Sequence, residues 1–399
     1  MSQKHTERIS GVEALIRSLL EEHVDTLFGY PGGQVINIYD GLYRHAHELS
    51  HILTRHEQGA VHAAQGYARA TGRVGVCLAT SGPGATNLIT GITDAMIDST
   101  PLVCITGQVP SALLGSDAFQ EADIITMTIP VTKWNFQVTR ATEIPEAIAR
   151  AFYIARTGRP GPVLIDITKN AQIEAAEFSY TPCTGFRSYT PKPALDTARI
   201  DRAMELINGA KQPLIVFGQG VKISGAEQAL VAFAEKANIP MASTVLGLSG
   251  VPTAHPLFMG MLGMHGNYAP NAMTQEADVI LAIGMRFSDR VTGDLKTYAK
   301  QAQIVHIDID HSEIGKNIKP AIGIHADALD ALTAMNERAQ FLERFTWFDL
   351  FREKYEYEYN NVIRKNIAPD SDTLTMAEVV RRVADYSRGN AVVVTDVGQ

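Results

Sequence analysis

The chain has 399 residues, 45% hydrophobic and 20% charged, a composition typical of a globular protein with two or three domains. The net charge is −8 and no basic cluster occurs, which argues against a nucleic-acid partner. Three scattered cysteines cannot build a disulfide framework. The polar amino terminus carries no signal-peptide pattern and no apolar run approaches about 18 residues, so we expect a cytoplasmic protein without a membrane partner.

The first part of the chain, to about residue 170, alternates helix and strand patterns. Helices are predicted at 9–22, 57–72 and about 84–99, and strands at 25–29, 73–80, 101–106 and 161–167. The strand at 73–80 is apolar from Val74 to Ala79, which is typical of a parallel strand covered on both faces. This alternation predicts an α/β fold with a doubly wound parallel sheet.

Residues 171–193 lose periodicity and gather Pro, Thr, Ser and Gly, so we interpret them as a linker. A second alternating block follows, with strands at 213–217, 278–283 and 303–307 and a helix at 226–237, ending near Ala339. The charged, aromatic segment 341–365 is predicted to be a helical surface connection. A helix at 373–386 and a buried strand at 391–395 would begin a third unit, which we expect to be truncated. The predicted domains are 1–180, 190–340 and 366–399.

Glu57 begins a helix composed largely of Ala and Gly, where small side chains would let a flat ligand approach. A zinc helix would need the spacing His-Glu-x-x-His, but Ala60 occupies the second histidine position and His62 is six residues after His56. The spacing therefore excludes this zinc motif. On local grounds Glu57 could still be an ordinary acidic residue at a helix N-terminus.

The turn Ser81-Gly82-Pro83-Gly84 follows a predicted strand directly. It does not fit the Gly-x-Ser-x-Gly nucleophile elbow, and Asn87 replaces the third glycine of a dinucleotide fingerprint. What remains is a tight turn at the carboxyl end of a strand, where open α/β sheets bind ligands. Close packing without a ligand is an equal alternative.

In the second block, Arg286 and Arg290 follow one predicted strand and Asp308 ends the next. Arginines and an acidic residue at strand ends suit a phosphate and a ribose hydroxyl, so the block is a candidate nucleotide-binding unit. Gly218 and Gly220 follow its first strand, where a ligand could approach the backbone. Taken singly, these residues could equally be surface charges and turns.

Taken together, these motifs resemble those of the large catalytic subunit of acetolactate synthase (acetohydroxyacid synthase), a thiamine-diphosphate enzyme. The resemblance covers essentially the whole chain. The motifs that carry it, in order, are Phe28-Gly29-Tyr30-Pro31-Gly32-Gly33, Arg55-His56-Glu57, Ser81 to Asn87, Gly107-Gln108-Val109-Pro110, Ser116 to Glu121 and Gly158 to Val163. The stretch 107–121 is the most specific to acetolactate synthases.

The resemblance implies a pyrimidine-binding domain, a central FAD-binding domain and a diphosphate-binding domain. It also implies the cofactors thiamine diphosphate, Mg²⁺ and FAD. The Mg²⁺ site would lie in the missing part of the third domain, so we expect no metal site in this chain. The implied reaction decarboxylates pyruvate and joins the two-carbon unit to a second pyruvate or to 2-oxobutyrate. It is the first common step of valine, leucine and isoleucine biosynthesis.

The resemblance implies three groups of site residues, and Glu57 would share a proton with the pyrimidine ring of the cofactor. A thiamine set would contact the cofactor: Tyr30, Glu57, Pro83, Asn87 and Gln399. A reaction set would lie near the reacting carbons or the substrate channel: Gly33, Gln120 and Lys169. A flavin set would hold FAD: Arg159, Gly218, Gly220, Thr244, Leu246, Arg286, Asp289, the stretch 263–284 with Gly263, Met264, His265 and Gly284, and the stretch 306–325 with His306, Asp308 and His325.

Two positions depart from the family pattern: Ser288 stands where Asp is usual, and Ser111 where many members have Arg. The implied partners are 2-oxo acid substrates, a second copy of the chain in a homodimer or larger homo-oligomer, and in some members a small regulatory subunit. Pyruvate oxidase and a non-catalytic flavin-binding fragment are the alternatives. The fragment alone is expected to be inactive, because the third domain is incomplete.

Overall fold

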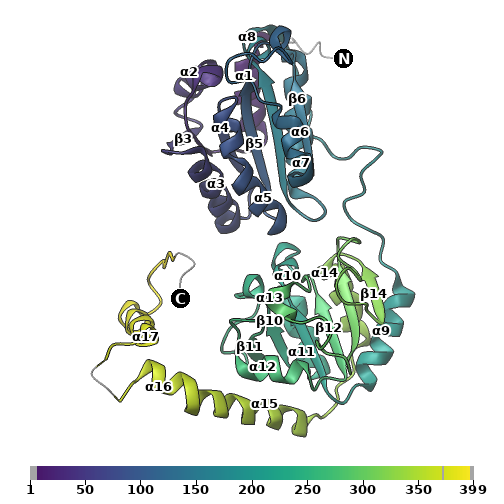
Figure 1. Ribbon diagram of the computed structural model, residues 1–399. Helices are drawn as coiled ribbons and strands as arrows, with labels where there is room; N and C mark the ends of the chain where they lie inside the picture. The colour runs from purple at the N-terminus through teal and green to yellow at the C-terminus, as the bar shows by residue number, and fades with distance from the viewer. Residues whose placement is uncertain (1–6, 371–372, 396–399) are drawn as a thin grey trace. The chain divides into compact units, whose positions relative to one another are not determined.

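The structure is a computed structural model that describes residues 7–370 and 373–395. The chain divides between Pro191 and Lys192 into two compact units. Each unit is built on its own six-stranded sheet (Figure 1).

The sheet of the first unit is parallel throughout, with the strand order β3-β2-β4-β5-β7-β6. Its central strands are buried along their whole length because helices cover both faces. The strands are β2 Thr26–Gly29, β3 Ser50–Leu53, β4 Gly75–Ala79, β5 Leu102–Gln108, β6 Trp134–Val138 and β7 Pro162–Thr168.

Two apolar layers cover this sheet. One face packs against α1 Gly11–Glu21, α2 Ile36–Arg44 and α7 Ile144–Arg156. The other packs against α3 Glu57–Thr71, α4 Pro83–Asn87, α5 Ile89–Ile97 and α6 Ile124–Thr128. The short helix α8 Lys169–Ile173 follows β7 directly. Helices on both faces of a parallel sheet confirm the expected doubly wound α/β fold.

The predicted linker at 171–193 is partly wrong. Its first residues, 171–173, complete α8, and the next ones form β8 Ala175–Phe178, which pairs antiparallel with β1 Glu7–Ser10 in a separate two-stranded sheet. Further on, the rings of Phe186 and Tyr189 stack 5.4 Å apart, and the Tyr189 hydroxyl donates to the Thr157 carbonyl at 2.7 Å. The Pro- and Ser-rich composition concealed these contacts because they are made by a few aromatic side chains.

The sheet of the second unit is also parallel, with the strand order β11-β10-β9-β12-β13-β14. β9 and β12 are the fully buried central strands. The strands are β9 Pro213–Phe217, β10 Met241–Ser243, β11 Phe258–Met261, β12 Val279–Ile283, β13 Gln303–Asp308 and β14 Ile322–His325.

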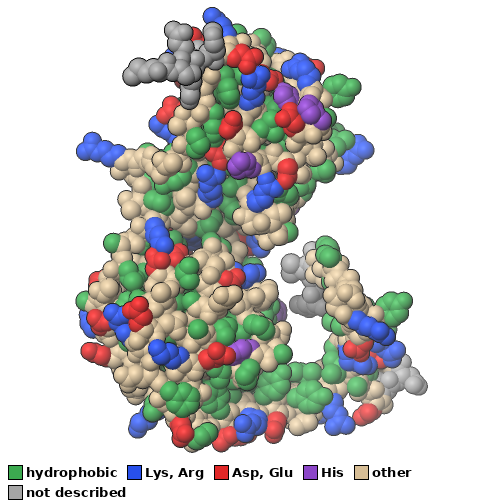
Figure 2. Space-filling model, turned by 180° about the vertical axis from the view of Figure 1, so that it is seen from behind, with side chains coloured by type: hydrophobic (Ala, Val, Ile, Leu, Met, Phe, Trp, Pro, Cys, Tyr) green, Lys and Arg blue, Asp and Glu red, His purple; other side chains and the backbone are tan. Residues whose placement is uncertain are grey.

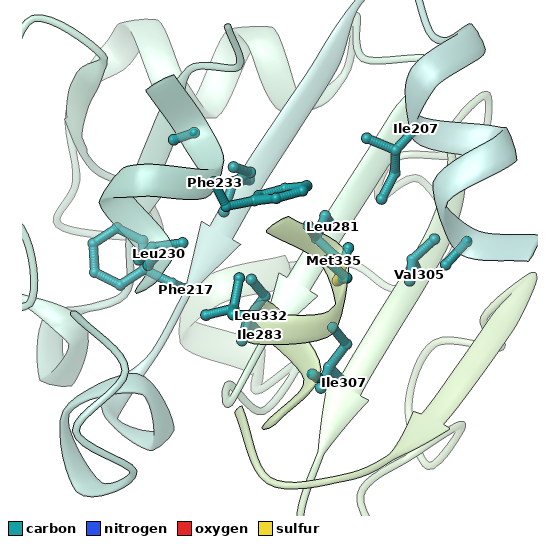
Figure 3. Close-up of a cluster of buried hydrophobic side chains, with 14 of the residues drawn as sticks. Ile207, Phe217, Leu230, Phe233, Leu281, Ile283, Val305, Ile307, Leu332 and Met335 are labelled. Carbon is teal, nitrogen blue, oxygen red and sulfur yellow. The ribbon is translucent and has the colours of Figure 1, made fainter. Parts of the chain in front are cut away.

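Helices again cover both faces of this sheet. One face packs against α9 Thr197–Gly209, α11 Glu227–Ala237 and α14 Ala328–Arg338. Figure 3 shows Phe233 and Met335 of these helices lying over Leu281 and Ile307 of the strands. The other face packs against α12 Tyr268–Thr274. Two short helices, α10 Gln219–Ile223 and α13 Asp289–Thr292, lie in the loops after β9 and β12.

The segment 341–365 is not only a surface connection. Helix α15 Phe345–Glu358 buries Trp347 and Phe351 in the second face of the sheet. The Trp347 indole Nε1 also donates to the Pro213 carbonyl at 2.9 Å. A π-helical turn at Tyr359–Ile363 and the short helix α16 Arg364–Ile367 follow. The first half of this segment therefore belongs to the second unit.

The prediction of a buried strand at 391–395 is wrong. Helix α17 Met376–Ser387 forms as expected, but residues 391–395 form no strand, and Val392 and Val394 are 94% and 90% exposed. A strand needs a neighbour for its backbone hydrogen bonds, and no described segment pairs with this one. An open apolar groove lies along α17 and is lined by Leu374, Val379, Val383 and Tyr386.

Candidate active site

In the first unit, the chain reverses its direction across the sheet between β2 and β4. From β2 it moves to β3 on one side, and from β4 it moves to β5 on the other. In open α/β sheets, ligands bind beyond the carboxyl ends of the strands at such a point. The segments that leave this point are Tyr30–Gly33 after β2 and Thr80–Pro83 after β4, so the motif 28–33 and the predicted turn 81–84 meet there.

Glu57 is the first residue of α3 and is only 7% exposed. Asn87, the last residue of α4, donates from Nδ2 to Glu57 Oε2 at 3.0 Å. This bond engages one carboxylate oxygen and leaves Oε1 for another donor. A methyl group on Gly84 would lie 3.2 Å from Oε1, so the glycine keeps that oxygen accessible. The thiamine-set residues Glu57, Pro83 and Asn87 thus come together.

Gln120 reaches the same turn through its backbone. A side chain on Gly82 would lie 2.5 Å from the Gln120 carbonyl oxygen, and Gly82 has the left-handed φ of 57° that favours glycine. Gln120 itself has a φ of 60°, which a non-glycine residue adopts at a cost. The loop between β5 and α6 is therefore held against the turn that carries Pro83, beside an 85% exposed Phe119.

Gly33 follows β2 and Lys169 follows β7, both at this edge of the sheet. No atom would lie within 4 Å of a methyl group on Gly33, so this glycine faces open space. The next residue, Gln34, donates its backbone N–H to Thr80 Oγ1 at 3.1 Å, and its carbonyl accepts from Gln172 of α8 at 2.8 Å. Lys169 begins α8. These bonds bring the segments of Gly33, Thr80 and Lys169 together.

Three buried polar atoms at this edge have no hydrogen-bond partner among the described residues. They are Ser81 Oγ, Gln34 Oε1 and Gln172 Oε1. Buried polar groups in proteins are nearly always paired, so an orphan at a ligand-binding edge is consistent with a partner outside the chain. Together with the open face of Gly33 and the accessible Glu57 oxygen, they fit a small heterocycle with ring nitrogens.

The second unit also reverses its strand order, between β9 and β12, and three glycines meet there. The Gly220 N–H donates to the Gly284 carbonyl at 2.9 Å. A methyl group on Gly218 would lie 2.5 Å from the Gly284 oxygen, and one on Gly284 would lie 2.7 Å from Gly220 Cα. These glycines are therefore required by backbone packing, and they expose main chain at the ligand-binding edge.

Other members of the flavin set surround these glycines. Thr244 donates its backbone N–H to the Phe217 carbonyl at 2.9 Å and caps the turn Val245–Gly247 that contains Leu246. The half-buried Arg286 makes no hydrogen bond or ion pair with the described residues. The Ser243 hydroxyl is buried without a partner in the described chain. An unpaired guanidinium and an orphaned hydroxyl fit a ligand with phosphate and hydroxyl groups.

The segment 263–265 is tied to the start of α13. Met264 donates its N–H to the Arg290 carbonyl at 2.7 Å, and Gly263, with a φ of 106°, packs directly against that carbonyl. Asn271 accepts from the Gly263 N–H at 2.9 Å. The exposed carboxylate of Asp289 lies 3.9 Å from Arg290. Gly263, Met264, His265 and Asp289 therefore lie in adjoining loops.

His306, Asp308 and His325 are held mainly by the protein. His306 is wholly buried on β13, where its Nε2 lies 3.1 Å from the Met285 carbonyl and burial lowers the pKa of its imidazole. Asp308 accepts from the Asp310 N–H at 2.8 Å, and His325 Nε2 lies 2.9 Å from the Ile309 carbonyl. His306 thus supports the loop after β12 through the Met285 carbonyl. A direct contact between His306 and a flavin stays a prediction.

Within the first unit, Arg159 lies away from Glu57. Arg159 precedes β7, at the opposite edge of the first sheet from Glu57, and its Nε donates to Ser99 Oγ at 2.8 Å. Gln399 lies outside the described residues. Tyr30, by contrast, follows β2 at the strand reversal and is exposed there.

Sequence reasoning missed three polar residues that the structure places close to the site. Asp166 is wholly buried in β7, and Gln108 ends β5 beside it. Tyr39 lies against Gly29, with its hydroxyl 3.3 Å from His51 Nε2; burial, and to a lesser degree the Glu57 charge, raise the pKa of its phenol. For Asp166 and Gln108 the available signal was a polar residue inside an apolar strand, which is rare unless the residue is paired.

Two general findings concern the described part of the chain. Within residues 7–370 and 373–395, no group of three His, Cys, Asp or Glu side chains is placed to hold a metal ion. The helices in the same ranges are too short or too polar to cross a membrane. On the face seen in Figure 2, described Lys and Arg side chains are interspersed with Asp and Glu.

Comparison with known families agrees with this geometry. Residues 9–127 match the family described as "Thiamine pyrophosphate enzyme, N-terminal TPP binding domain", and residues 200–335 match "Thiamine pyrophosphate enzyme, central domain". The class of protein that the two doubly wound units and the buried carboxylate define is thus a thiamine pyrophosphate enzyme.

Relatives narrow this class. The chain is 45% identical to a probable acetolactate synthase large subunit of Methanocaldococcus jannaschii, over 98% of this chain and 67% of the relative. It is 46% identical to an acetolactate synthase large subunit of Corynebacterium glutamicum, over 96% of this chain and 62% of the relative. It is 39% identical to the acetolactate synthase isozyme 2 large subunit of Escherichia coli, over 98% of this chain and 69% of the relative. The chain belongs to the acetolactate synthase large-subunit family, and it spans about two thirds of the length of these relatives.

Proposed function

We propose that the full-length protein containing this chain is an acetolactate synthase. It decarboxylates pyruvate on thiamine diphosphate and joins the two-carbon unit to a second pyruvate or to 2-oxobutyrate. The observation that carries this proposal is the buried Glu57 carboxylate, held by Asn87 at the strand reversal of the first sheet. The identity to acetolactate synthase large subunits over nearly the whole chain supports the same reaction.

Glu57 holds and moves a proton in this proposal. Thiamine diphosphate, when bound, supplies the nucleophilic carbon and the electron sink that decarboxylation of a 2-oxo acid requires. Since Oε2 accepts from Asn87, Oε1 is the atom left to exchange a proton with a ring nitrogen of the pyrimidine. Such an exchange is general acid–base catalysis by a positioned side chain.

The other residues of this edge bind and orient. Pro83 and the backbone around Gly82 form the surface against which a flat ring would lie, and Tyr30 flanks it. Gln120 and Lys169 offer polar groups to a 2-oxo acid carboxylate or carbonyl, and Gly33 leaves room for the reacting carbons. These roles follow from the family resemblance and from the placement of each residue at a strand end.

The second unit is proposed to bind FAD. The packed glycines Gly218, Gly220 and Gly284 expose backbone, and Arg286 offers an unpaired charge to the diphosphate. Of the remaining members of the flavin set, those between Thr244 and Asp289 follow β10, β11 and β12, while Asp308 and His325 are the last residues of β13 and β14. His306 is buried within β13, and Arg159 belongs to the first unit. In this proposal, FAD has a structural role and takes no part in turnover.

The wider assembly is also a proposal. It comprises Mg²⁺ bound by residues beyond this chain, a homodimer or larger homo-oligomer, a small regulatory subunit and a cytoplasmic location. The large-subunit names of the relatives support a partner subunit for those proteins. The three-domain division at 1–180, 190–340 and 366–399 stays a prediction.

One experiment tests the proposed reaction. The purified full-length protein, supplied with thiamine diphosphate, Mg²⁺, FAD and pyruvate, is expected to form acetolactate, which acid converts to acetoin for colorimetric measurement. Omission of thiamine diphosphate is the control and should abolish the product. Release of CO₂ and acetate instead of acetolactate would contradict the proposal and identify an oxidase.

A further inference from the structure

A buried polar network crosses the sheet of the first unit next to the candidate active site. Asp166 of β7 is 0% exposed and lies directly opposite Thr106 of β5 and Gln137 of β6 in the strand register. Thr106 Oγ1 donates to Asp166 Oδ1 at 2.7 Å, and Gln137 Nε2 donates to Oδ2 at 2.9 Å. A buried carboxylate is costly unless it is hydrogen-bonded, and these donors offset part of that cost.

The third donor, Gln108, connects this network to the active-site loop. Its Nε2 donates to Asp166 Oδ2 at 3.1 Å and to the Ala122 carbonyl at 3.0 Å. Its Oε1 accepts from the Val109 N–H at 2.9 Å. Val109 begins the loop after β5 and Ala122 ends it, so one side chain joins both ends of the 109–122 loop.

The tip of the loop is braced independently. Glu121 accepts from the Gly115 N–H at 2.5 Å and from the Ala118 N–H at 3.1 Å, and these backbone donors lower the pKa of its carboxyl. A loop whose tip is internally bonded moves mainly about its base. The base therefore decides whether Gln120 stays against Gly82, where its carbonyl packs.

We propose that Gln108, oriented by the buried Asp166 carboxylate, is a positioning residue that closes the base of the 109–122 loop and thereby holds Gln120 at the active site. The proposal rests on the proposed function for the role of Gln120. Asn170 is a second tie, since its Oδ1 accepts from the Ser111 N–H at 2.8 Å, but it holds only the first arm of the loop.

Asp166 is suited to orient Gln108 because it only accepts hydrogen bonds while ionised. Burial raises its pKa to about 6, while the donors Gln137, Thr106 and Gln108 oppose the rise. The other charged group that acts on it is Asp123, at the N-terminus of α6, which raises the pKa further.

The test compares two Gln→Leu variants in the full-length protein. Gln108→Leu removes the bonds to Ala122 and Val109, whereas Gln137→Leu removes a bond to the same Asp166 oxygen without touching the loop. In Gln108→Leu we expect amide hydrogen exchange in the 109–122 loop to quicken about tenfold and kcat to fall about tenfold, with thiamine diphosphate affinity unchanged. In Gln137→Leu both should stay within about twofold of the wild type.

Equal exchange in the two variants would overturn the inference, as would faster exchange in Gln108→Leu with unchanged kcat. Asp166→Asn is a second, near-isosteric probe, because an amide oxygen at the Oδ2 position still accepts from Gln108 and Gln137. It should keep the wild-type exchange at pH 7, and Asp166→Leu should lose it. If the wild type makes no acetolactate, the proposed function fails, and the exchange comparison still decides the inference by itself.

Discussion

The two sheets reverse their strand order in the same way but use the resulting edge differently. In the first unit, the edge around β2 and β4 presents an ionisable side chain, Glu57, and three buried oxygens without partners among the described residues, those of Gln34, Ser81 and Gln172. In the second unit, the edge between β9 and β12 is closed by Gly218, Gly220 and Gly284, which contact one another through backbone. The edge of the first unit therefore presents a reactive side chain to a ligand, whereas the edge of the second unit presents mainly backbone.

This difference matches two kinds of ligand. Proton transfer needs a side chain that is held but not covered, as Glu57 is by Asn87 and Gly84. An elongated cofactor that does not react needs close backbone approach and a few charges, as the glycines and Arg286 provide. A doubly wound fold can thus serve either purpose according to the residues at its strand reversal.

The largest expected effect follows from Glu57→Gln in the first unit. The amide keeps the size and the bond to Asn87 but cannot exchange a proton, so acetolactate formation by the full-length protein should fall at least about 100-fold. Flavin absorbance of the purified variant should match the wild type, since FAD is proposed to bind the other unit. Activity close to that of the wild type would remove Glu57 from the chemistry.

Gly284→Ala tests whether close packing defines the second edge. A methyl group there would lie 2.7 Å from Gly220 Cα at a φ of 53°, so we expect a loss of about 2–5 kcal/mol in the free energy of unfolding and loss of bound flavin. Urea denaturation monitored by circular dichroism measures the free energy of unfolding, and flavin release measures the bound cofactor.

Gly293→Ala is the matched control for that substitution. Gly293 has a similar φ of 58° but no atom within 4 Å of the added methyl group. It should therefore cost only the backbone strain of about 1–2 kcal/mol and keep the flavin. Equal losses in the two variants would show that strain, and not packing, requires the glycine at 284.

Asp166→Asn should change the pH dependence of stability. In the wild type the folded-state pKa is raised from 3.8 to about 6, so the unfolding free energy falls as pH rises from about 4 to 6 and then levels off. The raised pKa corresponds to about 2–3 kcal/mol over this window. Urea denaturation at pH 4 to 7 should show this fall in the wild type and not in the variant. If the unfolding free energies of both proteins change with pH in parallel, the raised pKa does not belong to Asp166.

Gly33→Ala should have the smallest effect on stability and still impair function. No atom lies within 4 Å of the new methyl group, and the backbone is outside the left-handed region, so the free energy of unfolding should change by less than about 0.5 kcal/mol. If the open space holds substrate, kcat/KM for pyruvate should fall about tenfold. An unchanged kcat/KM would mean that the space lies outside the reaction site.

Much of the fold could be predicted from the sequence because parallel, buried strands are continuous apolar runs. β9 was predicted at its observed bounds, and β4, β5, β7 and β12 within two residues. The short, partly exposed strands β6, β11 and β14 were missed, since their apolar residues are few. The valines at 391–395 stay exposed, because an apolar run becomes a strand only when another strand pairs with it.

The candidate site was predictable where a motif marks it and not where tertiary contacts build it. Glu57 and the 81–87 turn could be placed at one edge from their strand-to-helix order. The role of Gln108 could not, because its partners Ala122 and Asp166 lie 14 and 58 residues away. Gln108 contacts Asp166 because β5 pairs with β7, and the order of the strands in the sequence does not reveal that pairing.

The position of β6 has a consequence for synthesis on the ribosome. β6 is made before β7 but lies outside it, so its only neighbour in the described sheet is translated more than twenty residues later. Until residues 162–168 emerge, β5 has an open edge and β6 has no partner in that sheet. Unpaired edges are where nascent chains associate wrongly. The first unit is thus most exposed to misassembly just before β7 is complete, and slow translation across 139–161 would lengthen that interval.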